Sequence, residues 1–333
     1  MNKAHCPQVL SKPAVKPPSR RPYSALISRI IGRPLEIRAT GSRKTSTSAP
    51  SRILTAPASG ARIDPRLFQI AALGALLIFG VAARAFEITP AEFFVIGATA
   101  LTTQWAMSAI FAVKFEAKSA LITTLSLTLL LRAEALWPLA AAAFIAIASK
   151  FLLRMRGKHV FNPANIGIVA VTLATGAAWT TPGQWGTAVW LAALIAGVGS
   201  FVTWRASRLD VPLFFLGVFA MLLFARATWL GDPLSIPMLR LQNGALVLFA
   251  FFMISDPKTT PDGLLPRIAF AAGTAMLAYV FIFHFYKSDG VFYALAIACL
   301  IRPLIELFDS ARPYQWRDAT ISAADRKLIL PAE

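Results

Sequence analysis

Charged residues are scarce in this sequence, and acidic residues are the scarcest. Only 15% of the 333 residues are Asp, Glu, Lys or Arg, against about a quarter in soluble domains, whereas 56% are hydrophobic. This balance excludes an ordinary soluble domain and predicts a membrane protein. The 33 basic residues outnumber the 16 acidic ones. Because they lie in a tail and in alternate loops rather than on one amphipathic face, we expect no nucleic-acid partner.

The sequence also lacks the motifs of metal sites and of common catalytic centres. Its two cysteines, Cys6 and Cys299, are far apart and away from other ligand-type residues, so we expect neither a metal site nor a redox pair. It has no Gly-rich phosphate loop, no HExxH motif and no credible nucleophile triad. We therefore assign no catalytic residue. Whether the chain contributes to an enzyme as part of a larger complex stays open.

Residues 1–66 form a basic tail. The tail holds thirteen Lys and Arg residues against two acidic ones, Glu36 and Asp64, and it has no long apolar run. Such a segment cannot bury enough surface to become ordered, which predicts a disordered cytoplasmic arm. An organelle transit peptide or a start codon placed too far upstream would look the same. The arm could also dock on anionic lipid or on a partner protein.

Ten apolar segments follow the tail. They are residues 67–83, 91–113, 119–131, 137–153, 163–179, 185–204, 211–229, 241–254, 265–284 and 290–308. A full crossing takes about 20 residues, so the third, fifth and eighth segments are short, and lipid tolerates short segments only as broken helices packed inside protein. We expect an all-α polytopic membrane protein, with a transmembrane domain at 67–310 and a cytoplasmic C-terminal tail at 311–333.

The basic residues predict the orientation of the segments. With ten crossings and both termini in the cytoplasm, 28 of the 33 Lys and Arg residues fall on the cytoplasmic side. Ten segments divide into two sets of five, about 67–184 and 185–310, and an odd number in each set makes the two repeats inverted. Paired short or proline-broken segments at equivalent places in two such repeats indicate a binding site near the middle of the bilayer.

The first break in the hydrophobic pattern lies at residues 157–167. Asn162 can cap a helix whose first-turn residue is Pro163, and a helix start carries exposed N–H donors and partial positive charge. Beside Lys158 and His159 this start would attract an anion such as a flavin phosphate or a semiquinone. The same residues could simply begin a helix at the membrane surface, but Asn165 just inside the helix favours a site.

The second break lies at residues 255–261, where Asp256 can cap a helix and Pro257 follows it. An acid inside a membrane is a functional candidate, although Lys258 nearby makes a surface ion pair an equal alternative. The candidate cofactor-binding residues are Lys158, His159, Asn162, Asn165, Asn243, Ser255, Asp256 and Thr259.

Several motifs between residues 67 and 316 resemble a known family. They are VFNPA at 160–164, NGA at 243–245, FFMISDP at 251–257, DGV at 289–291, RPLIE at 302–306 and RPY at 312–314. In combination they are similar to RnfD, a membrane component of Rnf complexes, and to NqrB, its counterpart in the sodium-pumping NADH:quinone reductase. The resemblance implies ten helices in two inverted repeats, a fold similar to urea transporters, and electron transfer through flavins while an ion crosses. It also implies a bacterial inner membrane and other electron-transport subunits as partners.

One departure from this family concerns the flavin. Members with covalent FMN attach it to a threonine in an Asp-x-x-Ser/Thr-Gly-Ala-Thr motif after the fifth helix. In this chain the nearest match, TGAA at 175–178, lacks both the acid and the acceptor hydroxyl. We predict no covalent FMN, which leaves non-covalent FMN or riboflavin open. Shorter relatives of this kind include proteins that resemble membrane proteins encoded with enediyne biosynthesis.

The sequence is consistent with three functions. The first is a membrane subunit of a flavin-dependent, redox-driven ion-translocating complex, which is not catalytic alone. The second is a flavin-free channel or transporter for a small solute on the same scaffold. The third is an accessory membrane protein of a biosynthetic cluster, with its basic tail as the docking element.

Overall fold

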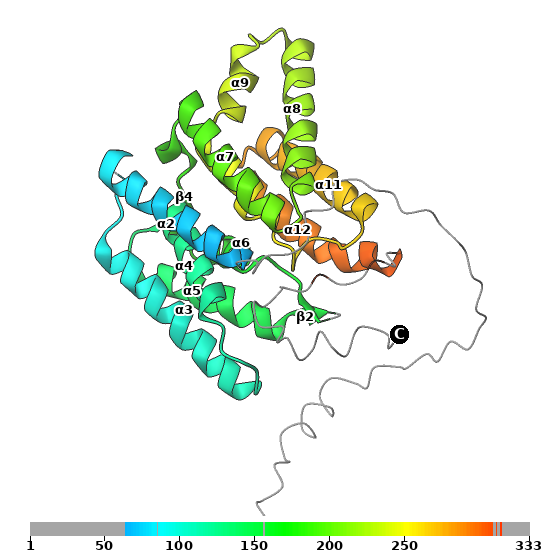
Figure 1. The fold of residues 1–333 in the computed structure, drawn as a ribbon. Coiled ribbons are helices and arrows are strands. Elements are labelled where there is room, and N and C mark those ends of the chain that lie inside the picture. The colour runs from blue at the N-terminus through cyan, green and yellow to red at the C-terminus, as the bar shows by residue number, and fades with distance from the viewer. Residues whose placement is uncertain (1–63, 85, 156, 309–310, 312–313, 315–333) are drawn as a thin grey trace, which may run out of the picture. The chain divides into compact units, whose positions relative to one another are not determined.

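The computed structural model describes residues 64–84, 86–155, 157–308, 311 and 314 (Figure 1). The predicted tails therefore lie almost wholly outside the described residues. Within those residues the α-helices are α2 (Pro65–Arg84), α3 (Pro90–Ile110), α4 (Ala117–Leu130), α5 (Leu136–Leu152), α6 (Pro163–Thr175), α7 (Val189–Arg205), α8 (Asp210–Leu230), α9 (Ser235–Leu241), α10 (Gly244–Phe252), α11 (Leu264–Phe283) and α12 (Gly290–Ile305). Short elements complete the list: β1 (Leu131–Ala133), β2 (Arg154–Met155), β3 (Lys158–His159), β4 (Ala178–Thr180) and the 3-10 turns η1 (Pro182–Trp185) and η2 (Glu306–Phe308).

Every expected apolar segment contains one of these helices, and two segments differ in detail. The fifth segment stops being helical at Thr175, because Gly176 adopts the left-handed conformation (φ +63°) that ends many helices. The eighth contains α10 (Gly244–Phe252), and a helix that the sequence did not predict, α9 (Ser235–Leu241), precedes it at an angle of 49°. Asn243 causes this division, since its side chain caps the first N–H groups of α10.

The chain is an all-α polytopic membrane protein. Four helices, α2, α3, α8 and α11, are long and apolar enough to cross a membrane, and the bent pair α9–α10 would make a fifth span. Five further apolar helices are shorter: α4, α5, α6, α7 and α12. The number of ten crossings stays a prediction, because the short helices do not by themselves have the length of a span.

The two halves of the described chain pack in the same order. In the first half α5 packs on α6 and α3, and α4 packs on α2 and α3; in the second half α11 packs on α12 and α8, and α10 packs on α7 and α8. The halves join where α2 meets α7 and where α6 meets α12. This order agrees with two five-helix repeats, whereas their inverted orientation remains a prediction.

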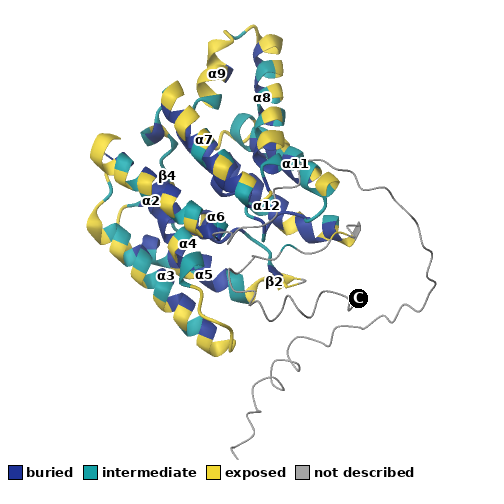
Figure 2. Ribbon diagram, in the orientation of Figure 1, coloured by how far each residue is buried: buried dark blue, intermediate teal, exposed yellow. Residues whose placement is uncertain are grey.

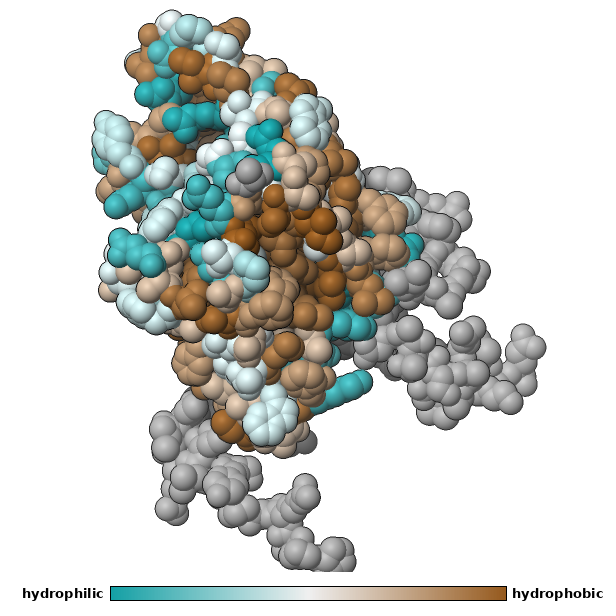
Figure 3. All heavy atoms as spheres, turned by 90° about the vertical axis from the view of Figure 1, so that its left-hand side faces the viewer, coloured by the Kyte–Doolittle hydropathy of each residue, from teal (hydrophilic) through white to brown (hydrophobic). Residues whose placement is uncertain are grey.

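The short helices α4 and α10 are mostly buried, whereas the long helices and the short α9 are largely exposed (Figure 2). All nine residues of α10 are buried, and so are nine of the fourteen in α4. By contrast, only 22–28% of each long apolar span is buried. Figure 3 shows a broad area of hydrophobic side chains over one face, as expected of a surface that meets lipid.

Close helix packing in the first half depends on Gly167 of α6. A Cβ atom at this position would lie 2.5 Å from the backbone oxygen of Ala142 in α5. Small residues of this kind let helix backbones approach closely in membranes, where packing rather than the hydrophobic effect holds helices together. The contact fixes the start of α6, which carries Asn162, against α5.

Two short antiparallel β-pairs were not expected from the sequence. β1 pairs with β4, with Leu131 opposite Thr180, and β2 pairs with β3, with Arg154 opposite His159. β1 begins directly after α4, a helix that ends among buried residues. Because no water reaches such a helix end, its backbone needs partners within the protein, and a two-stranded pairing supplies them.

The start of α2 includes residues that the apolar pattern assigns to the tail. Asp64 and Arg66 are buried and form an ion pair at 2.9 Å, and Arg66 also contacts Glu116 at 2.7 Å. Lys118 binds the same Asp64 carboxylate at 2.8 Å. Burial would raise the pKa of Asp64, but hydrogen bonds from Arg66 and Lys118 outweigh it and hold that pKa below its ordinary value. The ordered domain thus begins slightly earlier than the apolar pattern indicates.

Candidate functional site

The two breaks in the hydrophobic pattern meet at one cavity. Asn162 Nδ2 donates to the Met253 carbonyl at 3.1 Å, and His159 Nε2 lies 3.4 Å from Asp256 Oδ2. His159, Asn162 and Asp256 line a cavity of about 400 Å³, which we call the first cavity. Ends of α2, α3, α4, α5, α6 and α10 surround it. The two breaks therefore share one cavity, but the predicted helix start at Asp256 is wrong, because Asp256 lies in a turn and α11 begins only at Leu264.

The start of α6 is built as the sequence predicts. Asn162 Oδ1 accepts a hydrogen bond from the Asn165 N–H at 3.1 Å, and Pro163 occupies the first turn. Asn165 itself does not line the first cavity. It is 1% exposed, and its Nδ2 donates to the Phe292 carbonyl at 3.0 Å, which ties α6 to α12. Asn165 thus fixes the helix start in place.

Lys158 lies in a buried charge cluster rather than in the first cavity. Its Nζ contacts Asp262 Oδ2 at 2.9 Å, Glu306 Oε1 at 3.0 Å and the Thr260 carbonyl at 2.9 Å. Arg302 joins the same cluster through Glu306 at 3.2 Å. Two carboxylates therefore neutralise Lys158, and it does not present a free charge to an anion at the start of α6.

At the second break Asp256 and Lys258 line the first cavity, whereas the candidates Ser255 and Thr259 do not. Its Oδ1 accepts a hydrogen bond from the Lys258 N–H at 3.0 Å. Burial would raise the pKa of Asp256, but the hydrogen bond and charge of His159 outweigh it and hold that pKa below the ordinary 3.8. Ser255 donates to the Phe251 carbonyl, and the fully buried Thr259 donates to the Asp256 carbonyl. These two hydroxyls stabilise the turn.

The first cavity also holds a basic residue that sequence reasoning treated only as a marker of orientation. Lys150, in the last turn of α5, donates to Gln104 Oε1 of α3 at 2.7 Å and to Ser119 Oγ of α4 at 2.8 Å. One signal could have identified it. Lys150 follows the fully buried Ala143 and Ala146 at helical spacing of seven and four residues, which places it on the inward face of α5.

Asn243 lies at a different cavity of about 430 Å³, which we call the second cavity. Its Oδ1 accepts hydrogen bonds from the N–H groups of Ala245 and Leu246 at 2.9 and 3.3 Å, and its Nδ2 donates to the Pro182 carbonyl at 3.2 Å. Apolar side chains supply most of the lining, and Arg240 is its one charged member. The proposed set of site residues therefore divides between two places.

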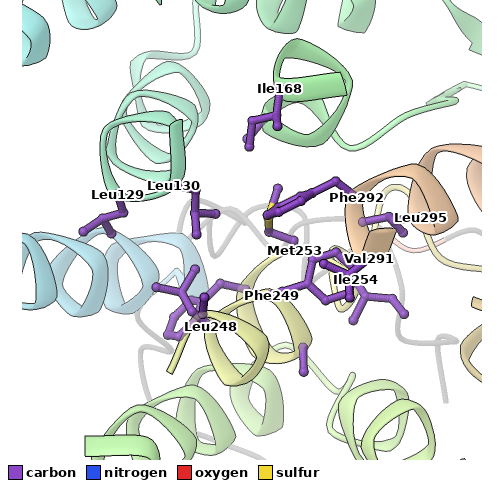
Figure 4. Packing of buried hydrophobic residues seen from close by; sticks show 14 of the residues in the cluster. Leu129, Leu130, Ile168, Leu248, Phe249, Met253, Ile254, Val291, Phe292 and Leu295 are labelled. Atoms are coloured by element: carbon purple, nitrogen blue, oxygen red, sulfur yellow. The ribbon is translucent and has the colours of Figure 1, made fainter. Parts of the chain in front are cut away.

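A plug of apolar side chains separates the two cavities. Figure 4 shows Leu130, Ile168, Leu248, Phe249 and Phe292 gathered around α10, from helices of both halves. Phe249 lies 5.6 Å from Phe292 between ring centroids. Helix α10 crosses this plug, because Leu246 near its start lines the second cavity and Phe252 at its end lines the first. At about 1.5 Å per residue these two positions are roughly 9 Å apart.

Comparison with known proteins finds sequence similarity in the second half of the chain. A sequence model of the NQR2, RnfD, RnfE family matches residues 179–315. Over these residues the chain is similar to that family. It is 34% identical over 158 residues to the D subunit of the ion-translocating oxidoreductase complex of Escherichia coli (strain K12 / DH10B), covering 46% of this chain and 40% of that protein. It is 32% identical over 146 residues to the protein of the same name from Citrobacter koseri, covering 44% and 39%.

The matched stretch spans about 40% of the length of these relatives of the NQR2, RnfD, RnfE family. The family model covers η1, α7 to α12 and therefore Asn243, the plug residues of α10 and the Asp256 turn. Lys150 and Asn162 lie before the matched residues. With bacterial relatives of this family and several apolar helices of spanning length, the chain is a bacterial membrane protein.

Proposed function

We propose that the chain is a membrane subunit of a redox-driven, ion-translocating electron-transport complex in which other subunits supply the electrons. Its relatives carry the name of such a subunit. The observation that carries the proposal is the pair of cavities at the two ends of α10. Two cavities on either side of a thin barrier are what alternating access to one path requires.

The plug around α10 is the barrier in this proposal. An ion would lose its hydration among Leu130, Leu248 and Phe249 without gaining polar partners, so the resting structure blocks passage. A movement of α10 relative to the first half would open the path. The redox state of a bound group could drive that movement only if the group binds the two positions of α10 with different affinity.

A flavin held without a covalent bond belongs to this proposal. We assign it to the first cavity, because both breaks contribute His159, Asn162 and Asp256 there and the volume lies in the range of small-molecule sites. The donors Asn162 and His159 suit the carbonyl and nitrogen edge of an isoalloxazine ring. Residues 175–178 lack an acceptor hydroxyl at the position where the family attaches FMN.

The experiment that tests the proposal is release of flavin from the purified full-length chain. We expect flavin fluorescence in the supernatant after denaturation and none on the denatured polypeptide in a gel. Asn162→Ala should lower the flavin released per protein, whereas Lys287→Met, which removes an exposed charge outside both cavities, should not. A colourless preparation that releases no flavin contradicts the flavin assignment.

A flavin-free transporter is the second candidate, and the same two cavities favour it. The discriminating measurement is solute or ion flux into proteoliposomes that contain the chain without redox partners. Flux that Asn162→Ala abolishes would support the transporter. Equal flux in parent and variant would remove the first cavity from the path.

A further inference from the structure

The first cavity is strongly basic. Arg66, Lys114, Lys150, Arg154 and Lys258 line it, against two acidic residues. Those acids, Glu116 and Asp256, already have partners. Positive charge in a concave, partly desolvated space attracts anions more strongly than the same charge on an open surface, because the low-dielectric walls reduce screening.

The acids of the first cavity do not neutralise Lys150. Glu116 binds Arg66 at 2.7 Å, and Asp256 lies 3.4 Å from His159. The Lys150 ammonium instead donates to two neutral oxygens, those of Gln104 and Ser119, at 2.7 and 2.8 Å. In the part of the chain that the structure describes, no carboxylate lies within ion-pair distance of it. An ammonium has three donors, so one N–H is left for a ligand.

Lys158 shows what a neutralised lysine looks like in the same protein. Only eight residues away, it contacts two carboxylates, those of Asp262 and Glu306, at 2.9 and 3.0 Å. A charge removed from water is costly unless it has a countercharge. Lys158 has its countercharge inside the fold. Lys150 has polar neighbours that orient it and an open cavity in front of it, which indicates that the missing countercharge comes from a ligand.

Other donors of the first cavity suit the same ligand. Ser119 and Ser126 lie on α4 and line the cavity, whereas the hydroxyl of Thr123 between them already donates to the Ser119 carbonyl at 3.0 Å. Ala164, in the first turn of α6, also lines it, and its N–H lies too early in the helix to have an acceptor one turn before. Hydroxyl groups and a helix start are common components of phosphate sites.

We propose that the first cavity binds a phosphate group, with the half-buried Lys150 as the countercharge and Arg154 and Lys258 as contacts nearer its rim. A phosphate carries close to two negative charges at neutral pH and accepts several hydrogen bonds, which matches several cations and hydroxyls around one space. The phosphate could be free inorganic phosphate or the terminal phosphate of FMN. The inference rests on the proposed function only in naming FMN as one source.

Calorimetric titration of the detergent-purified full chain tests the inference, with inorganic phosphate, FMN and riboflavin as probes at constant ionic strength. Lys150→Met keeps the length of the side chain and removes its charge. We expect it to weaken phosphate binding, or the binding of FMN, by about ten-fold or more, the usual effect of losing a charge-assisted hydrogen bond. Lys150→Arg should retain most of the affinity. Lys287→Met, an equal loss of charge at an exposed site outside both cavities, should change nothing.

The three probes separate the two sources of phosphate. Free phosphate is the ligand if inorganic phosphate binds and FMN binds no tighter than riboflavin. The flavin phosphate is the ligand if FMN binds at least ten-fold tighter than riboflavin and Lys150→Met removes the difference. Absence of both effects, or equal affinities in parent and Lys150→Met, overturns the proposal.

A second variant covers the case in which Lys150→Met does not fold. Arg154 lies on the exposed rim of the first cavity, and its side chain contacts only the Gly157 carbonyl among the hydrogen bonds of the described residues, at 3.0 Å. Arg154→Met should therefore fold and weaken phosphate binding a few-fold, and unchanged affinity contradicts the proposal. Phosphate binding by a preparation without flavin would leave this inference standing while the flavin part of the proposed function fails.

Discussion

The first and second cavities use the same backbone device and differ in their linings. Each lies at a helix start capped by an asparagine, Asn162 for α6 and Asn243 for α10. The first cavity adds lysines, arginines and the hydroxyls of α4, whereas the second adds apolar side chains and Arg240. The difference teaches that a capped helix start provides donors but does not select a ligand. Selection comes from the side chains that neighbouring helices place around it.

The one charged residue that lines the second cavity, Arg240, has a different kind of neighbour from Lys150. Arg240 lies over the Phe283 ring at 4.9 Å, and Arg226 lies over the same ring at 4.5 Å. Asp232 neutralises Arg226 at 3.2 Å. The guanidinium of Arg240 thus has an aromatic face as its close neighbour, while the ammonium of Lys150 donates to two neutral oxygens and lies farther, at 5.9 Å, from the Phe151 ring. The two ends of α10 therefore suit ligands of different chemistry.

The largest expected effect comes from Arg302. Its guanidinium donates to the backbone carbonyls of His159 and Lys258, two residues that line the first cavity. Arg302 is fully buried, and its guanidinium contacts Glu306 at 3.2 Å and the His159 carbonyl at 3.2 Å. Arg302→Met should lower the free energy of unfolding by about 3–5 kcal/mol, because it breaks a buried charge network. Denaturant titration in detergent measures this. Arg205→Met, on the partly exposed last turn of α7, is the control and should cost less than about 1 kcal/mol. If both variants lose the same free energy of unfolding, the buried charge network does not stabilise the fold more than an exposed charge does.

The two asparagine caps give the most direct comparison between the cavities. Asn162→Ala and Asn243→Ala should each lower the free energy of unfolding by about 1–2 kcal/mol, because each leaves helix-start N–H groups without an acceptor. Only Asn162→Ala should weaken binding of inorganic phosphate, since only that cap lines the first cavity. Thermal unfolding and calorimetric titration on the same preparations check both statements. Equal weakening by both variants would contradict the separation of the two cavities.

The smallest effect concerns the Asp256–His159 pair and depends on pH. Because the folded protein holds the pKa of Asp256 below its ordinary 3.8, the carboxylate contributes stability at pH values above 3.8 and loses that contribution as pH falls through the folded pKa. Both side chains are partly exposed, so the contribution should be below about 1 kcal/mol. Asp256→Asn should therefore melt at a lower temperature than the parent at pH 6, and the difference should shrink below pH 3.8. A gap that stays constant down to pH 3 would show that the charge of Asp256 does not matter.

Much of the fold could be predicted from the sequence because hydrophobic segment length and helix-start signals are local. The apolar segments, the helix break at Asn162–Pro163 and the break at Asp256–Pro257 all follow from short stretches of chain. Helix α9 (Ser235–Leu241) was missed, because the expected apolar segment begins only at residue 241. The strand pair β1–β4 was missed because its two strands are about fifty residues apart.

The candidate site was only partly predictable from the sequence, because many of its contacts join residues that are far apart along the chain. The sequence by itself determined a membrane protein, the two breaks in its hydrophobic pattern and the cap of α6 at Asn162. Only the tertiary structure decided that Lys158 is neutralised by Asp262 and Glu306, whereas Lys150 meets two neutral oxygens in a cavity. A capping side chain acts on N–H groups two or three residues away, so local sequence suffices for it. The charge state and role of a lysine depend on partners that arrive from other helices, and only packing brings those partners together.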